Sequence, residues 1–176
     1  LPNPFPRMTW QESVDRFGID RPDLRIPLEL VEVGDLLKDA DFKVFSGPAN
    51  DPEGRVAALK VPGGSKISRK QIDELTVFVS DFKAKGLAFF RVTETGLDSP
   101  IAKFFEAPDQ QAIIERFQAK PGDLLFLVAD KPAVTSAALG ALRARLGKEL
   151  QLFDPQQMHF AWLLDFPLFA WNEEER

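Results

Sequence analysis

The chain has 176 residues, of which 44% are hydrophobic and 28% are charged, and its formal net charge at pH 7 is -5. A chain of this length and composition buries enough apolar surface for one compact domain with an attached segment, and is too apolar to remain disordered. The absence of cysteine excludes disulfides and thiolate metal sites. We expect a cytoplasmic protein with no membrane segment, because the longest apolar runs fall far short of the roughly 20 residues that span a bilayer.

The N-terminal segment predicts a short helix at about residues 9–18. Thr9 followed by Glu12 has the spacing of a capping box, apolar residues then recur at helical spacing, and Gly18 is placed to end the helix. Residues 19–27 follow as a polar stretch whose prolines favour extended backbone. We expect a domain boundary in this stretch, open enough that proteases cut there first.

The next segments alternate between short elements. Residues 28–33 have the alternation of a half-buried strand, a short helix is expected at 35–38, and residues 42–47 are predicted to be a strand. A cluster of glycine, proline, asparagine and aspartate then predicts a turn before a strand at 55–61.

The second half of the chain alternates longer helices with strands. Ser68 and Gln71 form a second capping box, and the helix that follows is expected to end near Gly86. Asp130 is predicted to cap a long helix that ends at Gly147. The other expected elements are a strand at 86–92, one or two helices within 99–118, an apolar strand at 124–129 and a last strand at 160–166.

These elements predict an α+β fold. The predicted strands at 42–47 and 55–61 are joined by a turn alone, and a turn can connect only antiparallel neighbours. We therefore expect a largely antiparallel sheet with helices packed on it.

Charge is unevenly distributed along the chain. Residues 54–70 hold five basic residues and no acidic one, which leaves a formal charge of -10 on the rest. The favoured interpretation is a strand, a turn and a helix start with solvated lysines, because the glycine and lysine spacing does not fit a P-loop. The alternative is a local contact with nucleic-acid phosphates through exposed N–H groups of Gly63 and Gly64 and four basic side chains. These candidates are Arg55, Lys66, Arg69 and Lys70.

No other pattern predicts chemistry. The single histidine, His159, has no glycine-flanked serine to accompany it, and we expect it to be structural or solvated. One histidine without cysteine gives no metal site, and the acidic residues 173–175 are expected to be solvated. The aromatic residues fall mostly on apolar faces, which favours core packing over base stacking. We predict no catalytic, cofactor-binding or metal-binding residue.

Several runs of sequence resemble bacterial-type aspartyl-tRNA synthetases over nearly the whole chain. They are PFPRMTWQESVDRFG, DRPDLR, FSGPANDPEGRVAALKVPGG, KGLAFFRV and WLLDFPLFAW, in that order. The resemblance implies that residues 1–26 flank a class II catalytic domain, that 27–160 form its GAD insertion domain, and that 161–176 return to the catalytic domain. Trp10 and Ile19 depart from the usual pattern, and the role of residues 20–25 stays open.

The resemblance also implies what the parent enzyme does. It would be a homodimer that uses ATP and Mg²⁺ to form aspartyl-adenylate and transfers the aspartyl group to tRNA-Asp, while tRNA-Asn as a second substrate stays open. The ATP and aspartate motifs would lie outside the chain, so residues 1–176 alone should be inactive and hold no cofactor. The insertion would border the active site and the tRNA acceptor arm. The alternative is an independent GAD-like module that binds tRNA or protein, and a self-contained hydrolase lacks a nucleophile and base.

Overall fold

The structure is a computed structural model, and it describes residues 4–169. Seven strands occur within these residues. They are β1 (Arg7–Thr9), β2 (Leu30–Glu32), β3 (Arg55–Val61), β4 (Ala88–Thr93), β5 (Gly96–Asp98), β6 (Leu124–Asp130) and β7 (Trp162–Leu164). Sequence patterns missed β1 and β5, which have three residues each and too little alternation to be recognised.

Helices alternate with the strands along the described chain. They are α1 (Trp10–Phe17), α2 (Gly34–Leu37), α3 (Lys43–Asn50), α4 (Arg69–Ser80), α5 (Ala107–Phe117) and α6 (Pro132–Glu149). Two turns of 3₁₀ helix lie at η1 (Gly64–Lys66) and η2 (Ala102–Phe104). None of the helices within residues 4–169 is long and apolar enough to cross a membrane.

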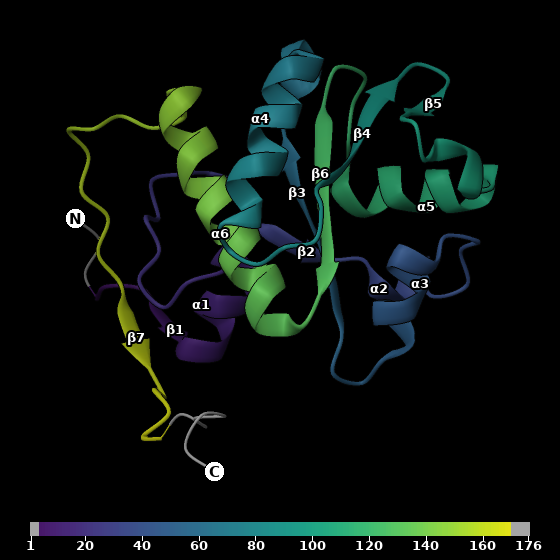
Figure 1. Cartoon of the computed structure of the whole chain (residues 1–176). Helices are drawn as coiled ribbons and strands as arrows, with labels where there is room; N and C mark the ends of the chain where they lie inside the picture. Colours follow the sequence, from purple (N-terminus) through teal and green to yellow (C-terminus); the bar gives the residue numbers. More distant parts are fainter. Residues whose placement is uncertain (1–3, 170–176) are drawn as a thin grey trace.

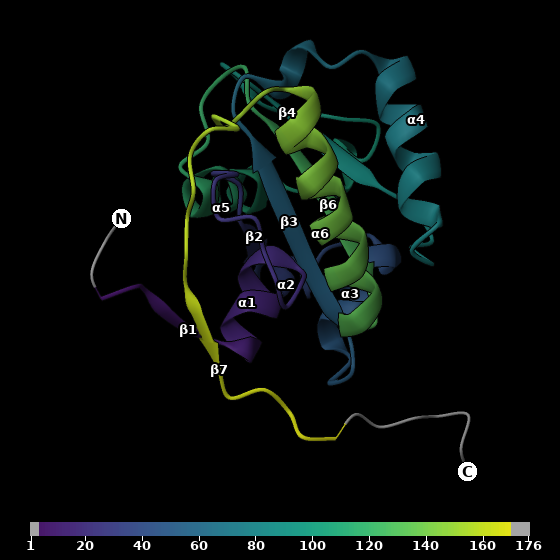
Figure 2. The same cartoon turned by 90° about the vertical axis from the view of Figure 1, so that its left-hand side faces the viewer.

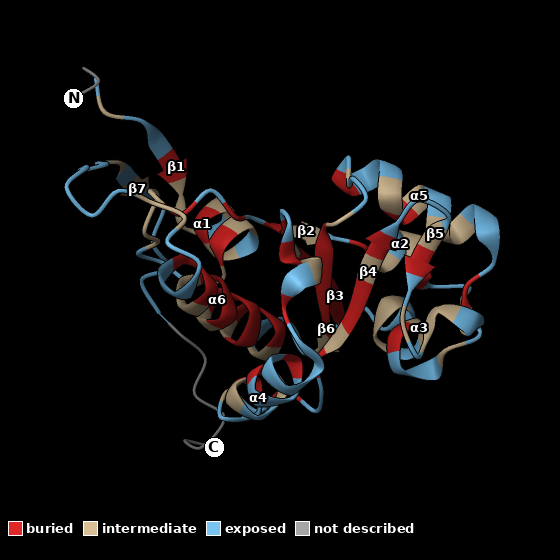
Figure 3. Ribbon diagram, turned by 90° about the horizontal axis from the view of Figure 1, so that it is seen from above, coloured by how far each residue is buried: buried red, intermediate tan, exposed pale blue. Residues whose placement is uncertain are grey.

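Five strands form one sheet in the order β2-β3-β6-β4-β5, and every neighbouring pair is antiparallel. Helices α4 and α6 cover one face, and α2, α3 and α5 cover the other, so the domain has three layers (Figures 1 and 3). The predicted α+β class with a largely antiparallel sheet is therefore confirmed.

The two central strands, β3 and β6, are almost continuously apolar because helices cover both faces of the sheet there. In the register of β3 and β6, Leu59 lies opposite Phe126, and both side chains face α4 and α6. Ala58 and Leu127 also lie opposite each other, but they face the other helical layer. Because successive side chains of a strand point to opposite faces, a strand covered on both sides needs apolar residues at every position.

The predicted strand at residues 42–47 is wrong, because this segment begins α3. Phe42 and Phe45 lie 5.1 Å apart between ring centroids, and Phe45 packs 6.1 Å from Phe105. A spacing of three residues places these rings on one face of a helix but on opposite faces of a strand. Pro48 lies inside this helix, which ends at Asn50. The antiparallel sheet was thus predicted partly from a strand pair that does not exist.

Three predicted helix ends also differ from the structure. Asp130 is the last residue of β6 and not a cap, because Pro132 occupies the first turn and makes Lys131 the N-cap of α6. Helix α6 continues past Gly147, which is buried against Ile26. Helix α4 ends at Ser80, well before Gly86, since Lys83 takes a left-handed conformation at φ 68°.

Strands β1 and β7 form a separate two-stranded parallel ribbon, in which Arg7 pairs with Trp162 and Thr9 with Leu164. The predicted strand at 160–166 is thus confirmed over its central part. One side of the ribbon is covered, since Met8 is buried. Large apolar side chains at alternate positions of the outgoing segment stay exposed. They are Phe160, Trp162, Leu164, Phe166 and Leu168.

Helix α1 begins and ends as predicted and lies against α6. Thr9 accepts a hydrogen bond from the Glu12 N–H at 3.0 Å, and Gly18 takes the left-handed conformation at φ 76°. Gly18 lies so close to Gly140 of α6 that a Cβ on either glycine would reach the backbone of the other. Phe17 is buried beside this contact.

The second part of the predicted boundary segment 19–27 is held to α6 by Arg143. This arginine is 2% exposed, and its guanidinium donates to the carbonyls of Leu28 at 2.5 Å, Ile26 at 2.8 Å and Asp23 at 3.0 Å. Burial lowers the pKa of Arg143 to about 10, so the group is still charged near neutral pH. Residues 19–21 are exposed, and the prediction that proteases cut first in this segment stays a prediction.

Arg25 gives the previously unassigned residues 20–25 a structural role. It donates to Asp23 and to the carbonyls of Pro155 and Gln157, and its guanidinium lies 4.6 Å from the ring centre of Phe153. The hydrogen bond from Arg25 lowers the pKa of Asp23. The segments that lead into and out of the domain are therefore held together at Arg25 as well as in the ribbon (Figure 2).

Candidate nucleic-acid interface

The second half of the basic run, residues 61–70, lies at one end of the sheet. Strand β3 ends at Val61, Gly63 turns the chain at φ 64°, and η1 leads into α4. Ser68 caps α4 in a complete capping box with Gln71, as predicted. Gly64 has no room for a side chain, because a Cβ would lie 2.9 Å from Val61 and from Leu124. The turn that carries Lys66 is consequently fixed by packing.

Internal hydrogen bonds occupy two backbone N–H groups of this turn. The Gly63 N–H donates to Asp123 Oδ1 at 3.0 Å, and the Ser65 N–H donates to the Gly122 carbonyl at 3.0 Å. Gly64 is buried. The prediction that Gly63 and Gly64 expose N–H groups to a phosphate is therefore wrong.

Three of the four predicted basic side chains project into solvent at this end. Lys70 has 88% of its side chain exposed and lies 4.0 Å from Glu74, and Arg69 is 62% exposed and paired with Asp73 at 3.1 Å. Lys66 is exposed on η1. Lys66 and Lys70 are thus available for phosphate contacts, while Arg69 already shares its charge with a carboxylate and lies over the Phe89 ring.

The structure separates Arg55 from these three residues. Its side chain is 7% exposed and donates to Glu32 at 2.6 Å, to Ser136 Oγ at 2.5 Å and to the Asp15 carbonyl at 2.7 Å. It lies at the start of β3, whereas Lys66 follows the end of that strand. Because its donors are used within the protein, Arg55 joins α1, β2 and α6 and is not part of the interface.

Other basic residues near this end have structural roles or extend the surface. Lys60 donates to the Phe117 carbonyl at 2.7 Å, and Arg91 donates to the carbonyls of Ser65 and Ile67. Lys120 is exposed in the turn beside Gly63. Lys148, near the C-terminal end of α6, is exposed as well. The arrangement offers separate cations for a polyanion and no enclosed site for one phosphate.

His159 lies on the exposed segment before β7, where it lines a small hollow with Pro6, Leu24, Met158 and Phe160. Within residues 4–169, no three histidine or acidic side chains lie close enough to hold a metal ion. The acidic residues 173–175 lie outside the described residues.

A family model matches more than half of the chain. Residues 45–139 match the model of the GAD domain. The matched segment starts within α3 and contains β3, α4, β4, β5, α5, β6 and the first part of α6. It includes Lys66, Arg69 and Lys70, but neither α1 nor the β1 and β7 ribbon.

Proposed function

The chain belongs to the GAD domain family, which occurs in class II aminoacyl-tRNA synthetases, and from this premise we propose that it is the insertion domain of a bacterial-type aspartyl-tRNA synthetase with parts of the catalytic domain on both sides. The observation that carries this proposal is the pairing of β1 with β7. An inserted domain leaves its host near the point where it entered, and this ribbon brings the two segments side by side (Figure 1).

The flanks support a host domain over an independent module. A two-stranded ribbon is at best marginally stable in water, and the ribbon here leaves large apolar side chains exposed along β7. We propose that the catalytic domain covers them, with residues 1–26 and 161–176 as its flanks and 27–160 as the insertion. The sequences of both flanks, which resemble parts of a class II catalytic domain, favour this host over an autonomous module that binds tRNA or protein.

ATP and Mg²⁺ belong to the catalytic domain of the proposed homodimeric parent. The glycine turn at residues 62–66 does not fit as a phosphate cradle, since the N–H groups of Gly63 and Ser65 are already bonded. We propose that residues 1–176 contribute a binding surface and that the catalytic groups of the parent enzyme lie outside them.

The amino acid specificity of the parent is the first testable consequence. The longer enzyme should catalyse pyrophosphate exchange into ATP with aspartate and not with asparagine or lysine, while residues 1–176 alone should give no exchange. The assignment would be refuted if residues 1–176 alone catalysed pyrophosphate exchange and if point substitutions within them abolished that activity. If the parent enzyme instead catalysed the exchange with lysine or asparagine, the chain would still be an insertion domain, but its host would be a synthetase of that other amino acid.

We propose that Lys66 and Lys70, with Arg69 beside them, meet phosphates of the tRNA acceptor arm in the docked parent enzyme. Each neutralised phosphate contributes roughly -0.7 to -0.9 to the slope of log K against log salt. Replacing Lys66 and Lys70 by glutamine should therefore flatten this slope for tRNA binding by about 1.5.

The matched control for this measurement replaces two exposed lysines on the other side of the domain, Lys38 and Lys43, by glutamine. This pair should leave the slope unchanged although it removes the same charge. Aspartate activation without tRNA should be unaffected in both variants. Equal slopes for the two double variants would show that the basic run is only a strand, a turn and a capped helix.

A further inference from the structure

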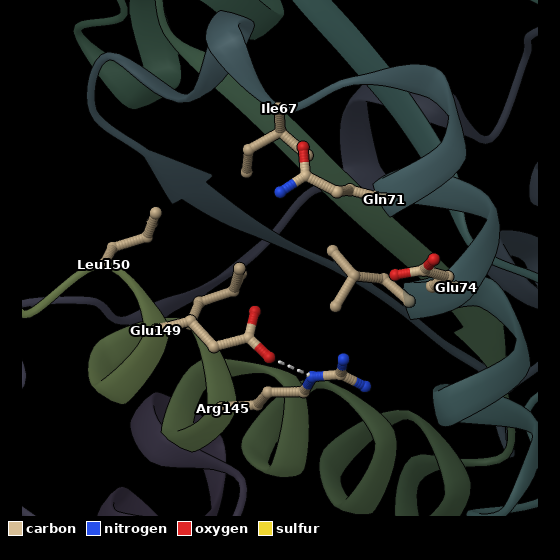
Figure 4. A pocket seen from close by; sticks show the side chains of 8 residues that line it. Ile67, Gln71, Glu74, Arg145, Glu149 and Leu150 are labelled. Carbon is tan, nitrogen blue, oxygen red and sulfur yellow. Dashed lines mark hydrogen bonds and ion pairs between the residues drawn. The ribbon is translucent and has the colours of Figure 1, made fainter.

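A groove lies beside the basic run, between the N-terminal half of α4 and the C-terminal half of α6. Its volume is about 350 Å³. The groove is lined by side chains from both helices and from the turn before α4 (Figure 4). Leu75 and Leu146 are buried beneath it, whereas Leu150 is 38% exposed at its edge. The groove therefore combines an apolar floor with a solvent-facing opening.

Polar groups around the floor keep free hydrogen-bonding capacity. Gln71 uses its Oε1 to accept from the N–H and Oγ of Ser68, which leaves its Nε2 directed into the groove (Figure 4). Arg145 donates from Nε to Glu149 at 2.7 Å, and its two terminal nitrogens remain as donors. Glu74 points into the groove from α4, and its closest cation is the Lys70 ammonium at 4.0 Å.

This combination suits a flat ring with donors and acceptors on its edge. Unpaired RNA bases are held in this way, by apolar or stacking contact with the ring and hydrogen bonds to its edge. The charges also define the orientation of such a ligand. Glu74 and Glu149 outweigh Arg145 within the groove, so a phosphate is repelled there, whereas Lys66 and Lys70 lie next to the lining residues Ile67 and Gln71 in the sequence.

We propose that this groove binds one unpaired nucleotide of RNA, with the base between α4 and α6 and its phosphates on Lys66 and Lys70. The inference rests on the proposed contact with tRNA and adds a site that reads a base. The Glu74 carboxylate accepts hydrogen bonds and donates none, and in the proposed complex it faces the 4-position of a pyrimidine ring. It therefore favours cytosine, which carries an amino group on its edge, over uracil, which carries a carbonyl at the same position.

The test measures binding of the full chain to 5′-labelled tetracytidylate and tetrauridylate by fluorescence anisotropy at low salt. Tetracytidylate should bind about tenfold tighter, as expected for one well-placed base contact. Glu74→Gln should reduce this preference to about twofold or less, because an amide both donates and accepts. The matched control is Glu53→Gln, which removes the same charge from the exposed turn before β3 and should keep the full preference.

The outcomes separate this inference from the proposed function. Equal binding of the two oligonucleotides by the unchanged chain, or a preference that survives in Glu74→Gln, overturns the base site. If Lys66→Gln with Lys70→Gln still flattens the salt slope for tRNA, the phosphate contact stands and only the base site falls. If neither oligonucleotide binds and the slope is also unchanged, the RNA contact at this end of the domain falls with it.

Discussion

Replacing Arg143 by methionine is expected to lower the free energy of unfolding by about 3 kcal/mol, a large part of the 5–15 kcal/mol typical of a domain. The guanidinium serves the carbonyls of Leu28, Ile26 and Asp23, and methionine can donate to none of them. A buried carbonyl left without a donor costs about 1–3 kcal/mol. Removing a buried charge recovers part of this cost, because the desolvation that lowers the pKa of Arg143 disappears with the group.

The control for this substitution lies two residues further along the same helix. Arg145→Met removes an arginine that is 32% exposed and paired with Glu149 on the surface. Surface ion pairs contribute about 0–1 kcal/mol, so this variant should stay close to the unchanged protein. Urea unfolding of both variants gives the comparison. Similar losses for Arg143→Met and Arg145→Met would mean that the clamp on residues 23–28 contributes little to folding.

Local signals explain which parts of the fold could be predicted from the sequence. The N-caps Thr9 and Ser68 and the left-handed Gly18 act within four residues of their partners, and the structure confirms all three. Helix α3 could not be predicted in this way, because its conformation depends on packing of Phe45 against Phe105. That contact joins residues 60 positions apart, and glycine and proline within the segment indicated a turn instead.

The roles of the basic residues in the candidate interface also could not be predicted from local sequence. Arg55 and Lys66 lie in one basic run, and nothing in the run itself distinguishes them. Their roles differ because the partners of Arg55 are Glu32, Ser136 and the Asp15 carbonyl, all of which approach only in the folded chain. Burial of Arg55 follows from the sheet and its two neighbouring helices, and burial decides whether a cation can meet a phosphate.

Arg143 did leave a signal in the sequence. It sits between Leu139, Leu142 and Leu146, at positions that share one face of α6. A charged residue within an apolar helical stripe has to find partners in the interior, because burying an unpaired charge is costly. Its acceptors are backbone carbonyls of residues 23–28, which have no side-chain signature. The need for partners was therefore predictable, but their identity was not.

Replacing Gly18 by alanine is expected to destabilise the protein by about 3 kcal/mol, from two additive causes. At φ 76° an alanine is strained by about 1–2 kcal/mol. Its Cβ would also collide with the Ser136 carbonyl and lie 2.7 Å from Gly140 Cα, and both belong to the backbone of α6. Because a helix backbone cannot move aside as a side chain can, α1 would have to separate from α6.

Two other glycines separate these causes in the same urea experiment. Gly63 has φ 64° and open space around it, so Gly63→Ala should show the conformational strain alone, about 1–2 kcal/mol. Gly47 lies in α3, also with open space, and Gly47→Ala should be neutral or stabilise by up to about 1 kcal/mol because alanine favours helix. If Gly18→Ala cost no more than Gly63→Ala, α1 could move away from α6 freely. In that case the close contact of Gly18 with Gly140 would not hold the catalytic-domain flank of the proposed parent to the insertion.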